Sequence, residues 1–577
     1  MKKLQTILEW ALLLFTALLG LKFTHSAGTP EIPAFYGSDA ASIFYGTASS
    51  FLFVFLSALL LLFSLLLNRK LNPLSLLWLG AVFCSLPGIV NASTPEMVRQ
   101  TLPYLAGLGC FAAAVNLQLE RDPALGRKLI IAILTGGALA LLHGWHQMLS
   151  GMNELEEFVS EQGLAQQMDE TMLRQIASDR LYGPFQLCNT YGGYLAALLP
   201  LALTAAVLWA KNKVQPPRPA MLILGGLILL LFAIPLWRTG SRGAVLTLFA
   251  GIFAVLFVLF HTRKARLILA GCGVIAAAAG ICMVIFVRGA ESMIFRFDYA
   301  LAACKMMFAH PFTGTGWGDF FTDYPGLKLL SNDETPHSPH NLVLFFGSQC
   351  GLAGFLAALA LLAVPLFAGF RKVFRMRKES GLTDETLLAA GLLGSLTVIS
   401  LNSLIEVGIE VPAYAALLIL LSALLCCRNG QTATTPQRQL LTALPVGIFA
   451  LLTLICSLCE MKREAAFADL YIKSSPVYTR NLNADAIRKA YLAAPQDSPY
   501  VHRTMANYLA GTGQSEAAKV CLDKALELAP EQIGTRRMRV QLCAVLGLDT
   551  KDDTAYILRH DPQNPENRKL PGCTMEK

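Results

Sequence analysis

The chain has 577 residues, of which 54% are hydrophobic and only 15% are charged. Soluble globular proteins carry about 25% charged residues, so this composition excludes an ordinary soluble protein and indicates a membrane protein. The formal net charge of +8 does not indicate nucleic-acid binding, because most basic residues stand in short segments between apolar runs.

Apolar runs follow one another through the first 460 residues. Since a membrane span needs roughly 20 apolar residues, we predict an all-α, polytopic membrane helix bundle of about 12–13 spans in residues 1–460. The first run follows Lys2 and Lys3 and is interpreted as an uncleaved span rather than a signal peptide. The predicted spans are 5–24, 49–67, 74–91, 101–119, 129–148, 189–210, 220–237, 243–260, 267–287, 341–369, 386–404, 411–427 and 440–459.

Basic residues are concentrated in alternate loops, which by the positive-inside rule places the N-terminus in the cytoplasm. Two long loops, 149–188 and 288–340, then lie on the non-cytoplasmic side together with residues 461–577. Long loops in a compact membrane protein usually carry function. The basic residues expected in the cytoplasm include Arg69, Lys70, Arg121, Arg127, Lys128, Lys211, Lys213, Arg218, Arg263, Lys264, Arg266, Arg371, Lys372, Arg375, Arg377, Lys378, Arg428 and Arg438.

Two arginines stand in a very short turn on the outer side, where the positive-inside rule disfavours them. Arg238 and Arg242 are accompanied by Gly240 and Gly243, which allow a ligand to approach the backbone closely. Guanidinium groups suit bidentate binding of phosphate, so we expect Arg242 to bind phosphates at the membrane surface. For Arg238, an extended side chain that reaches lipid headgroups is an equally open interpretation.

A histidine pair precedes the long apolar run that begins near residue 341. Pro339 fixes the chain beside His340, so this imidazole is expected at the boundary between membrane and water. An imidazole that titrates near neutrality can accept a proton from a sugar hydroxyl, and His337 is the competing candidate. No carboxylate stands at a recognised ligand spacing, and the fourteen cysteines include only one C-x-x-C pair, so no metal or other cofactor is predicted.

The region 461–577 has the composition of a soluble helical domain and contains a weak repeat. The stretch 488–495 recurs loosely as 523–530, each ending in proline, and Pro562 follows at a similar distance. A period of roughly 34 residues is typical of tetratricopeptide repeats, and Gly511 and Gly513 fall where that unit has its turn. Two unrelated amphipathic helical hairpins are the alternative.

Three polar segments on the outer face, taken in order, resemble motifs of the O-antigen ligase superfamily. This superfamily includes lipopolysaccharide O-antigen ligases, O-antigen polymerases and bacterial O-linked oligosaccharyltransferases. The resemblance covers about residues 180–365 in motif detail. One departure is Leu187-Cys188-Asn189, where many members have Asn-Pro-Asn. The matching residues are Arg180, Gly183 and Asn189 for R-x-x-G…N; Thr239, Ser241, Arg242 and Gly243 for T-x-S-R-G; and His340, Asn341, Gly351 and Gly354 for H-[N/S/Q]-x9-G-x-x-G.

The resemblance implies inverting, metal-independent glycosyl transfer at the periplasmic face of a bacterial inner membrane. The donor would be a glycan on undecaprenyl diphosphate, and the acceptor lipid A–core, another glycan or a protein. Arg180 and Arg242 would stabilise the diphosphate leaving group, and His340 would activate the acceptor hydroxyl. The C-terminal repeats would bind a protein partner or the acceptor.

Four functions remain in competition at this point. A ligase and a chain-extending polymerase differ only in the acceptor, and a protein O-oligosaccharyltransferase would explain a repeat domain that binds polypeptide. A transporter is less favoured, because transporters place charged residues and broken helices near the membrane midplane and these spans have almost none there.

Overall fold

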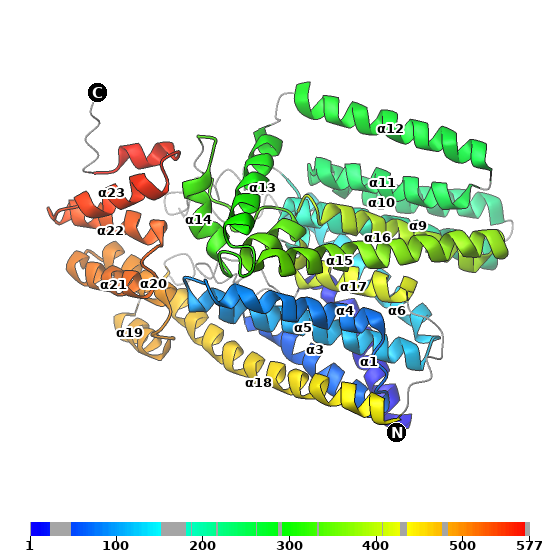
Figure 1. The fold of residues 1–577 in the computed structure, drawn as a ribbon, viewed down its shortest axis with the longest axis horizontal. Helices are drawn as coiled ribbons and strands as arrows, with labels where there is room; N and C mark the ends of the chain where they lie inside the picture. Colours follow the sequence, from blue (N-terminus) through cyan, green and yellow to red (C-terminus); the bar gives the residue numbers. More distant parts are fainter. Residues whose placement is uncertain are drawn as a thin grey trace.

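The computed structural model describes residues 2–22, 48–151, 180–185, 187–214, 217–260, 262–286, 291–331, 334–406, 408–426, 436–475 and 483–571. Within these ranges every regular element is a helix, which confirms the predicted all-α class. Most of the predicted loop 149–188 lies outside the described residues. Figure 1 shows the long helices side by side in one bundle, with a group of shorter C-terminal helices at one end.

Apolar helices account for twelve of the thirteen predicted membrane spans, all but 267–287. Ten helices of the described chain are long and apolar enough to cross a membrane, and two apolar helices are shorter. The bundle helices are α1 (Lys2–Leu18), α3 (Ala48–Leu67), α4 (Pro73–Ser85), α5 (Pro95–Arg121), α6 (Leu125–His146), α9 (Cys188–Lys213), α10 (Pro217–Arg238), α11 (Arg242–Leu259), α12 (Arg263–Phe286), α15 (Leu342–Glu379), α16 (Asp384–Asn402), α17 (Pro412–Cys426) and α18 (Pro436–Ser474).

The two short spans differ from full-length helices for local reasons. At 74–91 the helix α4 has only 13 residues and continues as the 3-10 turn η2 (Leu86–Ile89), which contains Pro87. At 411–427 the helix α17 has 15 residues and begins at Pro412. Proline cannot donate the backbone hydrogen bond that would continue a helix. The first apolar run is therefore interrupted near Pro87, and the second is limited at its start by Pro412.

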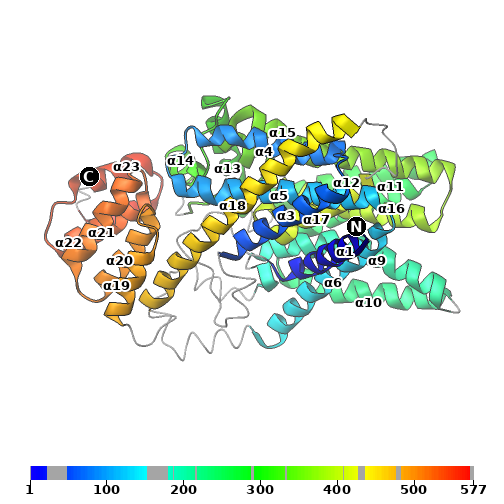
Figure 2. The same cartoon turned by 90° about the horizontal axis from the view of Figure 1, so that it is seen from below.

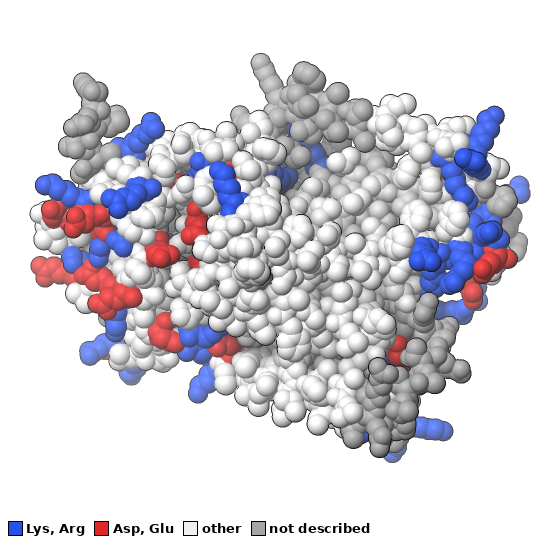
Figure 3. Space-filling model, in the orientation of Figure 1, with Lys and Arg blue, Asp and Glu red and all other residues white. Residues whose placement is uncertain are grey.

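Charged side chains lie at the two ends of the bundle. Figure 3 shows Lys and Arg gathered at the end away from the C-terminal helices, mixed charges at the opposite end, and an almost uncharged surface between them. The basic end includes the last turns of α5, α9 and α15. An uncharged band between two charged ends is what a membrane protein presents to lipid.

The predicted loop 288–340 is itself a folded structure. It contains α13 (Glu291–Ala309) and α14 (Asp319–Leu327), which pack through a small core that includes Tyr299 and Tyr324. Asp298 accepts hydrogen bonds from the Tyr324 hydroxyl at 3.0 Å and from the Leu329 amide at 3.1 Å. The helices α13 and α14 therefore form a folded cap beside the bundle.

The C-terminal region is a set of short helices that follows α18. Its helices are α19 (Ala484–Ala493), α20 (Pro499–Gly511), α21 (Ser515–Leu528), α22 (Ile533–Val545) and α23 (Lys551–His560). Helix α18 runs without a break through the predicted boundary at 460, and Figure 2 shows it leading from the bundle into the C-terminal helices. Gly511 and Gly513 lie at the turn between α20 and α21, and the tetratricopeptide assignment stays a prediction.

The C-terminal helices contact the bundle through ion pairs. Asp497 pairs with Arg99 of α5 at 3.1 Å, and the fully buried Lys328 and Asp561 pair at 3.3 Å. Ser331 also donates to the carbonyl oxygen of Gln563 at 3.1 Å. The C-terminal region is thus attached to both the N-terminal end of α5 and the segment after α14.

Candidate functional site

The Arg180 segment lies against the turn between α10 and α11. The Arg180 guanidinium donates to the Thr239 carbonyl oxygen at 2.9 Å and to Asn189 Oδ1 at 3.0 Å. The amide of Leu181 donates to the carbonyl oxygen of Arg238 at 3.0 Å. Two predicted motifs, separated by about 50 residues of sequence, are therefore joined by two hydrogen bonds, and the Arg180–Asn189 bond lies within the first motif.

Gly183 makes the close packing of this segment possible. Its φ is 52°, and a Cβ there would lie 2.7 Å from the ring of Tyr191. The Gly183 amide donates to Gln147 Oε1 at 2.8 Å. An alanine at this position would clash with the Tyr191 ring and would be strained at this positive φ. This glycine therefore has a structural role.

Arg242 stands at the first position of α11, directly after a tight turn. Gly240 has φ 64°, and the Ser241 hydroxyl caps the helix by accepting from the Ala244 amide. The Arg242 side chain is exposed, and within the described chain it makes no hydrogen bond or ion pair. The guanidinium is positively charged, and the N-terminus of a helix carries a partial positive charge. This position therefore favours an anionic ligand such as phosphate.

His340 has an unusual backbone conformation at the start of α15. Its φ is 51°, and Asn341 follows as the helix cap, accepting from the amides of Val343 and Leu344 at 3.0 Å. The Asn341 amide group donates to the Leu404 carbonyl oxygen at 2.8 Å. A left-handed conformation costs free energy in a residue with a side chain, so the surrounding contacts hold the imidazole in place.

The buried carboxylate of Glu406 pairs with His340. Its Oε1 lies 2.7 Å from His340 Nδ1, and its Oε2 lies 3.2 Å from the Arg296 guanidinium. Burial alone would raise the pKa of Glu406, but the neighbouring charges of His340 and Arg296 and the hydrogen bonds from His340 and Asn189 lower it. A carboxylate only accepts hydrogen bonds, so Nδ1 carries a proton, and in the neutral form of the imidazole Nε2 is left as the proton acceptor.

The three motifs predicted from sequence meet around Glu406. Asn189, which binds Arg180, also hydrogen-bonds the Glu406 carboxylate. A Cβ on Gly243 would lie 2.6 Å from the Ile405 side chain, so the turn that carries Arg242 packs directly on the same loop. The chain of contacts runs from Thr239 through Arg180, Asn189 and Glu406 to His340.

Gly351 and Gly354 serve the architecture of α15 rather than a ligand. Gly351 has φ 74° and ψ −163°, which breaks the helix, and a Cβ there would lie 2.4 Å from the Pro311 carbonyl oxygen. That oxygen accepts from the Leu352 amide at 2.8 Å. At Gly354 a Cβ would lie 2.8 Å from the Phe346 carbonyl oxygen. The two glycines of the G-x-x-G signature therefore allow the backbone near Pro311 to pack closely against α15 where the helix is broken.

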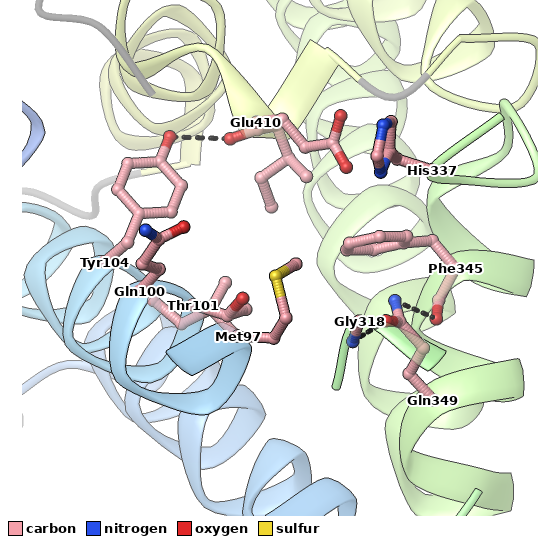
Figure 4. Close-up of a pocket in the computed structure, with 11 residues that line it drawn as sticks. Met97, Gln100, Thr101, Tyr104, Gly318, His337, Phe345, Gln349 and Glu410 are labelled. Carbon is pink, nitrogen blue, oxygen red and sulfur yellow. Dashed lines mark hydrogen bonds between the residues drawn. The ribbon is translucent and has the colours of Figure 1, made fainter. Parts of the chain in front are cut away.

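His337 lies apart from the Glu406 pair. Its ring stacks on Phe321 with 4.3 Å between centroids, and it lines a pocket together with Glu410. Figure 4 shows the side chains of His337 and Glu410 directed toward one another. The carboxylate that orients His340 is Glu406.

The acidic and aromatic partners of His340 were not predicted from the sequence. Glu406 and Glu410 stand in the short connection between two apolar runs, and two carboxylates so close to the spans are a signal that the sequence offered. Arg296 and Tyr299 come from α13, inside the predicted loop 288–340. The Tyr299 ring lies 5.9 Å from the His340 ring, and its hydroxyl donates to Glu334.

Metal binding needs several ligating side chains close together. Among the described residues, no group of three or more His, Cys, Asp or Glu side chains lies close enough to hold a metal ion. The predicted metal independence stays a prediction, to be tested with a chelator.

Comparison with known proteins gives one family match. Residues 227–359 match the family model described as O-antigen ligase, and no curated protein matches the chain. The matched region includes Arg238, Arg242, Arg296, His337 and His340. It covers the second and third sequence motifs and leaves out Arg180 and Glu406, which the structure brings to the same place.

Proposed function

Because residues 227–359 belong to the O-antigen ligase family, we propose that this protein transfers a glycan from undecaprenyl diphosphate to an acceptor hydroxyl. The family supports glycosyl transfer of the O-antigen ligase or polymerase type in general. The carrier, the periplasmic face of the inner membrane and the roles of single residues belong to this proposal.

The arginines of the site suit the leaving group. Negative charge builds on the diphosphate as the bond to the sugar breaks, and preorganised donors aimed at that charge lower the barrier. Arg242 is exposed at a helix N-terminus, and Arg180 is held beside the same turn by Thr239 and Asn189. Arg238, exposed at the end of α10, is the third candidate for binding the diphosphate.

His340 suits the acceptor side of the reaction. With Nδ1 hydrogen-bonded to Glu406, Nε2 can take the proton of an acceptor hydroxyl as the oxygen attacks the anomeric carbon. The proton passes to the imidazole, the new glycosidic bond forms, and the bond from the anomeric carbon to the diphosphate breaks. Direct attack from the face opposite the diphosphate inverts the anomeric configuration.

One observation carries the proposal. Arg180, Arg242 and His340 come from three distant segments, and these segments meet around the loop that contains Glu406. A binding scaffold without chemistry would not need a carboxylate to fix the tautomer of a half-buried imidazole. A second candidate, protein O-oligosaccharyltransferase, is favoured by the helical C-terminal region attached to α5 and the cap.

The donor assignment is tested with Arg242→Ala in the purified protein and a lipid-linked glycan as donor. Loss of an electrostatic contact to the leaving group should lower the rate of transfer by roughly 10²–10³-fold. The matched control is Arg375→Ala, an exposed arginine of α15 at the other end of the bundle. Equal rates in Arg242→Ala and the control would refute the proposed donor site.

The acceptor is identified from the products of the same reaction. A ladder of longer carrier-linked chains without added acceptor indicates a polymerase. Transfer that requires lipid A–core indicates a ligase, and transfer to a serine or threonine of an added protein indicates an oligosaccharyltransferase. Activity that survives a chelator is expected in all three cases.

A further inference from the structure

A buried ion pair joins the C-terminal helices to the cap. Lys328 Nζ lies 3.3 Å from Asp561 Oδ1, and neither side chain is more than 1% exposed. Asp561 directly follows α23, and its other oxygen accepts from Arg537 at 2.5 Å and from Asn564 at 3.1 Å. Lys328 directly follows α14, and Figure 1 shows α14 between α23 and α13. The pair therefore fixes two parts of the chain that are 233 residues apart in sequence.

Lys328 also contacts the aromatic core of the cap. Its Nζ lies over the Tyr324 ring, 5.5 Å from the ring centroid. A cation over an aromatic face is attracted by it, and more strongly where water is excluded. The Tyr324 hydroxyl donates to the buried Asp298 at 3.0 Å, so this ring is held from α13 as well as from its own helix. Loss of the ion pair would leave the buried ammonium without this carboxylate and would disturb the ring beneath it.

The Tyr324 ring leads to the proposed catalytic histidine. It packs edge-on against Tyr299 of α13, with 5.1 Å between ring centroids and an interplanar angle of 83°. The Tyr299 ring in turn lies 5.9 Å from the His340 ring. Packed interiors have little free space, so a displacement of one ring is felt by the next. A series of contacts therefore runs from the buried ion pair to His340.

Two features favour a positioning role for this pair over attachment alone. A buried ion pair adds little net stability compared with an apolar contact of similar volume, because both charges lose their water. Its hydrogen bonds nevertheless fix one geometry. His340, with its φ of 51°, depends on surrounding contacts to stay in place, and the Tyr299 ring is one of them. The matched family region ends at residue 359, so the carboxylate that holds Lys328 comes from outside it.

We propose that Lys328 and Asp561 are positioning residues for the reaction. The C-terminal helices hold the end of α14 in place, and through Tyr324 and Tyr299 they hold the imidazole of His340. This assignment rests on the proposed glycosyl transfer and adds two residues to it, one of them in the C-terminal region. That region is then part of the working site and not a separate domain.

Histidine NMR on the full chain in nanodiscs tests the positioning without requiring turnover. The proton on His340 Nδ1, hydrogen-bonded to Glu406, should give a resonance that His340→Ala removes, which assigns it. Asp561→Asn and Lys328→Met should each shift or broaden this resonance. Asp552→Asn, a matched change at an exposed position of α23, should leave it unchanged.

The rate of transfer from a lipid-linked glycan is the second readout. A displacement of about 1 Å at the reacting groups can lower kcat by roughly 10²-fold. We expect each single variant to lower kcat to this extent and to leave the donor KM unchanged, because the proposed diphosphate-binding arginines lie on other elements. If the two residues act as a unit, Asp561→Asn combined with Lys328→Met should also lose roughly 10²-fold, whereas two independent changes would multiply to roughly 10⁴-fold.

A milder variant keeps the test decisive if the buried pair is needed for folding. Arg537 is partly exposed and holds Asp561 from the C-terminal side. Arg537→Gln loosens this carboxylate without removing a charge from the buried pair. It should change the His340 resonance and kcat in the same direction and to a smaller extent.

Several results would overturn the proposal. An unchanged Nδ1 resonance in every folded variant would show that the pair does not position His340, and so would a fall in kcat without a change in this resonance. A raised donor KM at unchanged kcat, or a loss of roughly 10⁴-fold in the double variant, would also contradict it. If the wild-type protein shows no transfer at all, the proposed function fails, while the NMR experiment still decides whether the pair positions His340.

Discussion

At the scale of single residues, the site depends on how backbone and side chain constrain each other at His340. The left-handed backbone of His340, the Asn341 cap and the hydrogen bond from Asn341 to Leu404 fix the imidazole against the Glu406 loop. The proposed proton acceptor is therefore positioned before any substrate arrives. Such preorganisation is the main source of rate enhancement in sites of this kind.

Glu406→Gln tests the orienting role of the carboxylate. The amide can still form one hydrogen bond, but it no longer requires a proton on His340 Nδ1, so a fraction of the imidazole presents the wrong tautomer. We expect kcat to fall by roughly 10²–10⁴-fold, the usual contribution of general base catalysis, with little change in the donor KM. A steady-state comparison with the wild type checks this, and a variant that changes only the donor KM would contradict it.

Gly351→Ala tests the structural role of the G-x-x-G signature. The new Cβ would lie 2.4 Å from the Pro311 carbonyl oxygen at a positive φ, and backbone strain alone costs about 1–3 kcal/mol. We expect a clearly lower Tm by scanning fluorimetry. Gly80→Ala on α4 is the matched control, since a Cβ there meets nothing within 4 Å. Equal Tm values in the two variants would contradict the structural role.

Much of the site at this scale was predictable, and the reason for the rest is physical. Arg180, Asn189, Arg242 and His340 belong to local motifs, which remain visible in one sequence, and the structure brings them together. Glu406 acquires its role only through the packing of one loop against α15, and no local pattern encodes that contact.

At the scale of elements, α13 and α14 form a cap that the apolar pattern of the sequence does not predict. The segment 288–340 is predicted only as a long loop, because α13 is of mixed polarity, α14 has only 9 residues, and both gain stability from packing. The long apolar spans needed no such contacts to be recognised. Their composition and length alone indicate helices in a membrane.

The acidic face of α14 predicts a pH dependence. Burial and the charge of Glu531 raise the pKa of Asp323 to about 6, while His310 acts in the opposite direction. Burial also raises the pKa of the neighbouring Asp319 to about 7. Since an unfolded aspartate titrates near 3.9, the folded state favours the protonated acid. Its stabilising contribution is full below about pH 4 and is lost as the pH rises through about 6.

Asp323→Asn should therefore stabilise α14 at high pH only. Hydrogen exchange of α14 amides, compared between variant and wild type at each pH, should agree below about pH 4 and show slower exchange in the variant at about pH 8. A difference of equal size at both pH values would contradict the titration of Asp323.

At the scale of the whole molecule, the C-terminal helices are attached by contacts that are unusual for an independent domain. The Lys328–Asp561 pair is almost fully buried, and Asp561 also pairs with Arg537 at 2.5 Å. Removing one partner from a buried pair costs about 3–5 kcal/mol, because the other charge stays buried. The C-terminal region is therefore expected to stay docked on the cap.

Lys328→Ala tests this attachment. We expect faster protease cleavage between the bundle and the C-terminal helices, seen as release of a C-terminal fragment under native conditions. Lys569→Ala serves as the control, because its pair with Glu566 is exposed and exposed pairs contribute little. Identical cleavage of the two variants would mean that the buried pair does not hold the C-terminal region in place.

The central claim, that His340 is the base in transfer from a lipid-diphosphate donor, is tested most directly by one single-turnover measurement. Purified wild-type protein and His340→Ala are each mixed with a labelled lipid-linked glycan and acceptor, and bound donor and product are followed over time. We predict that both proteins bind the donor, and that only the wild type forms product and releases undecaprenyl diphosphate at a measurable rate. Product formation by His340→Ala at the wild-type rate would contradict the account.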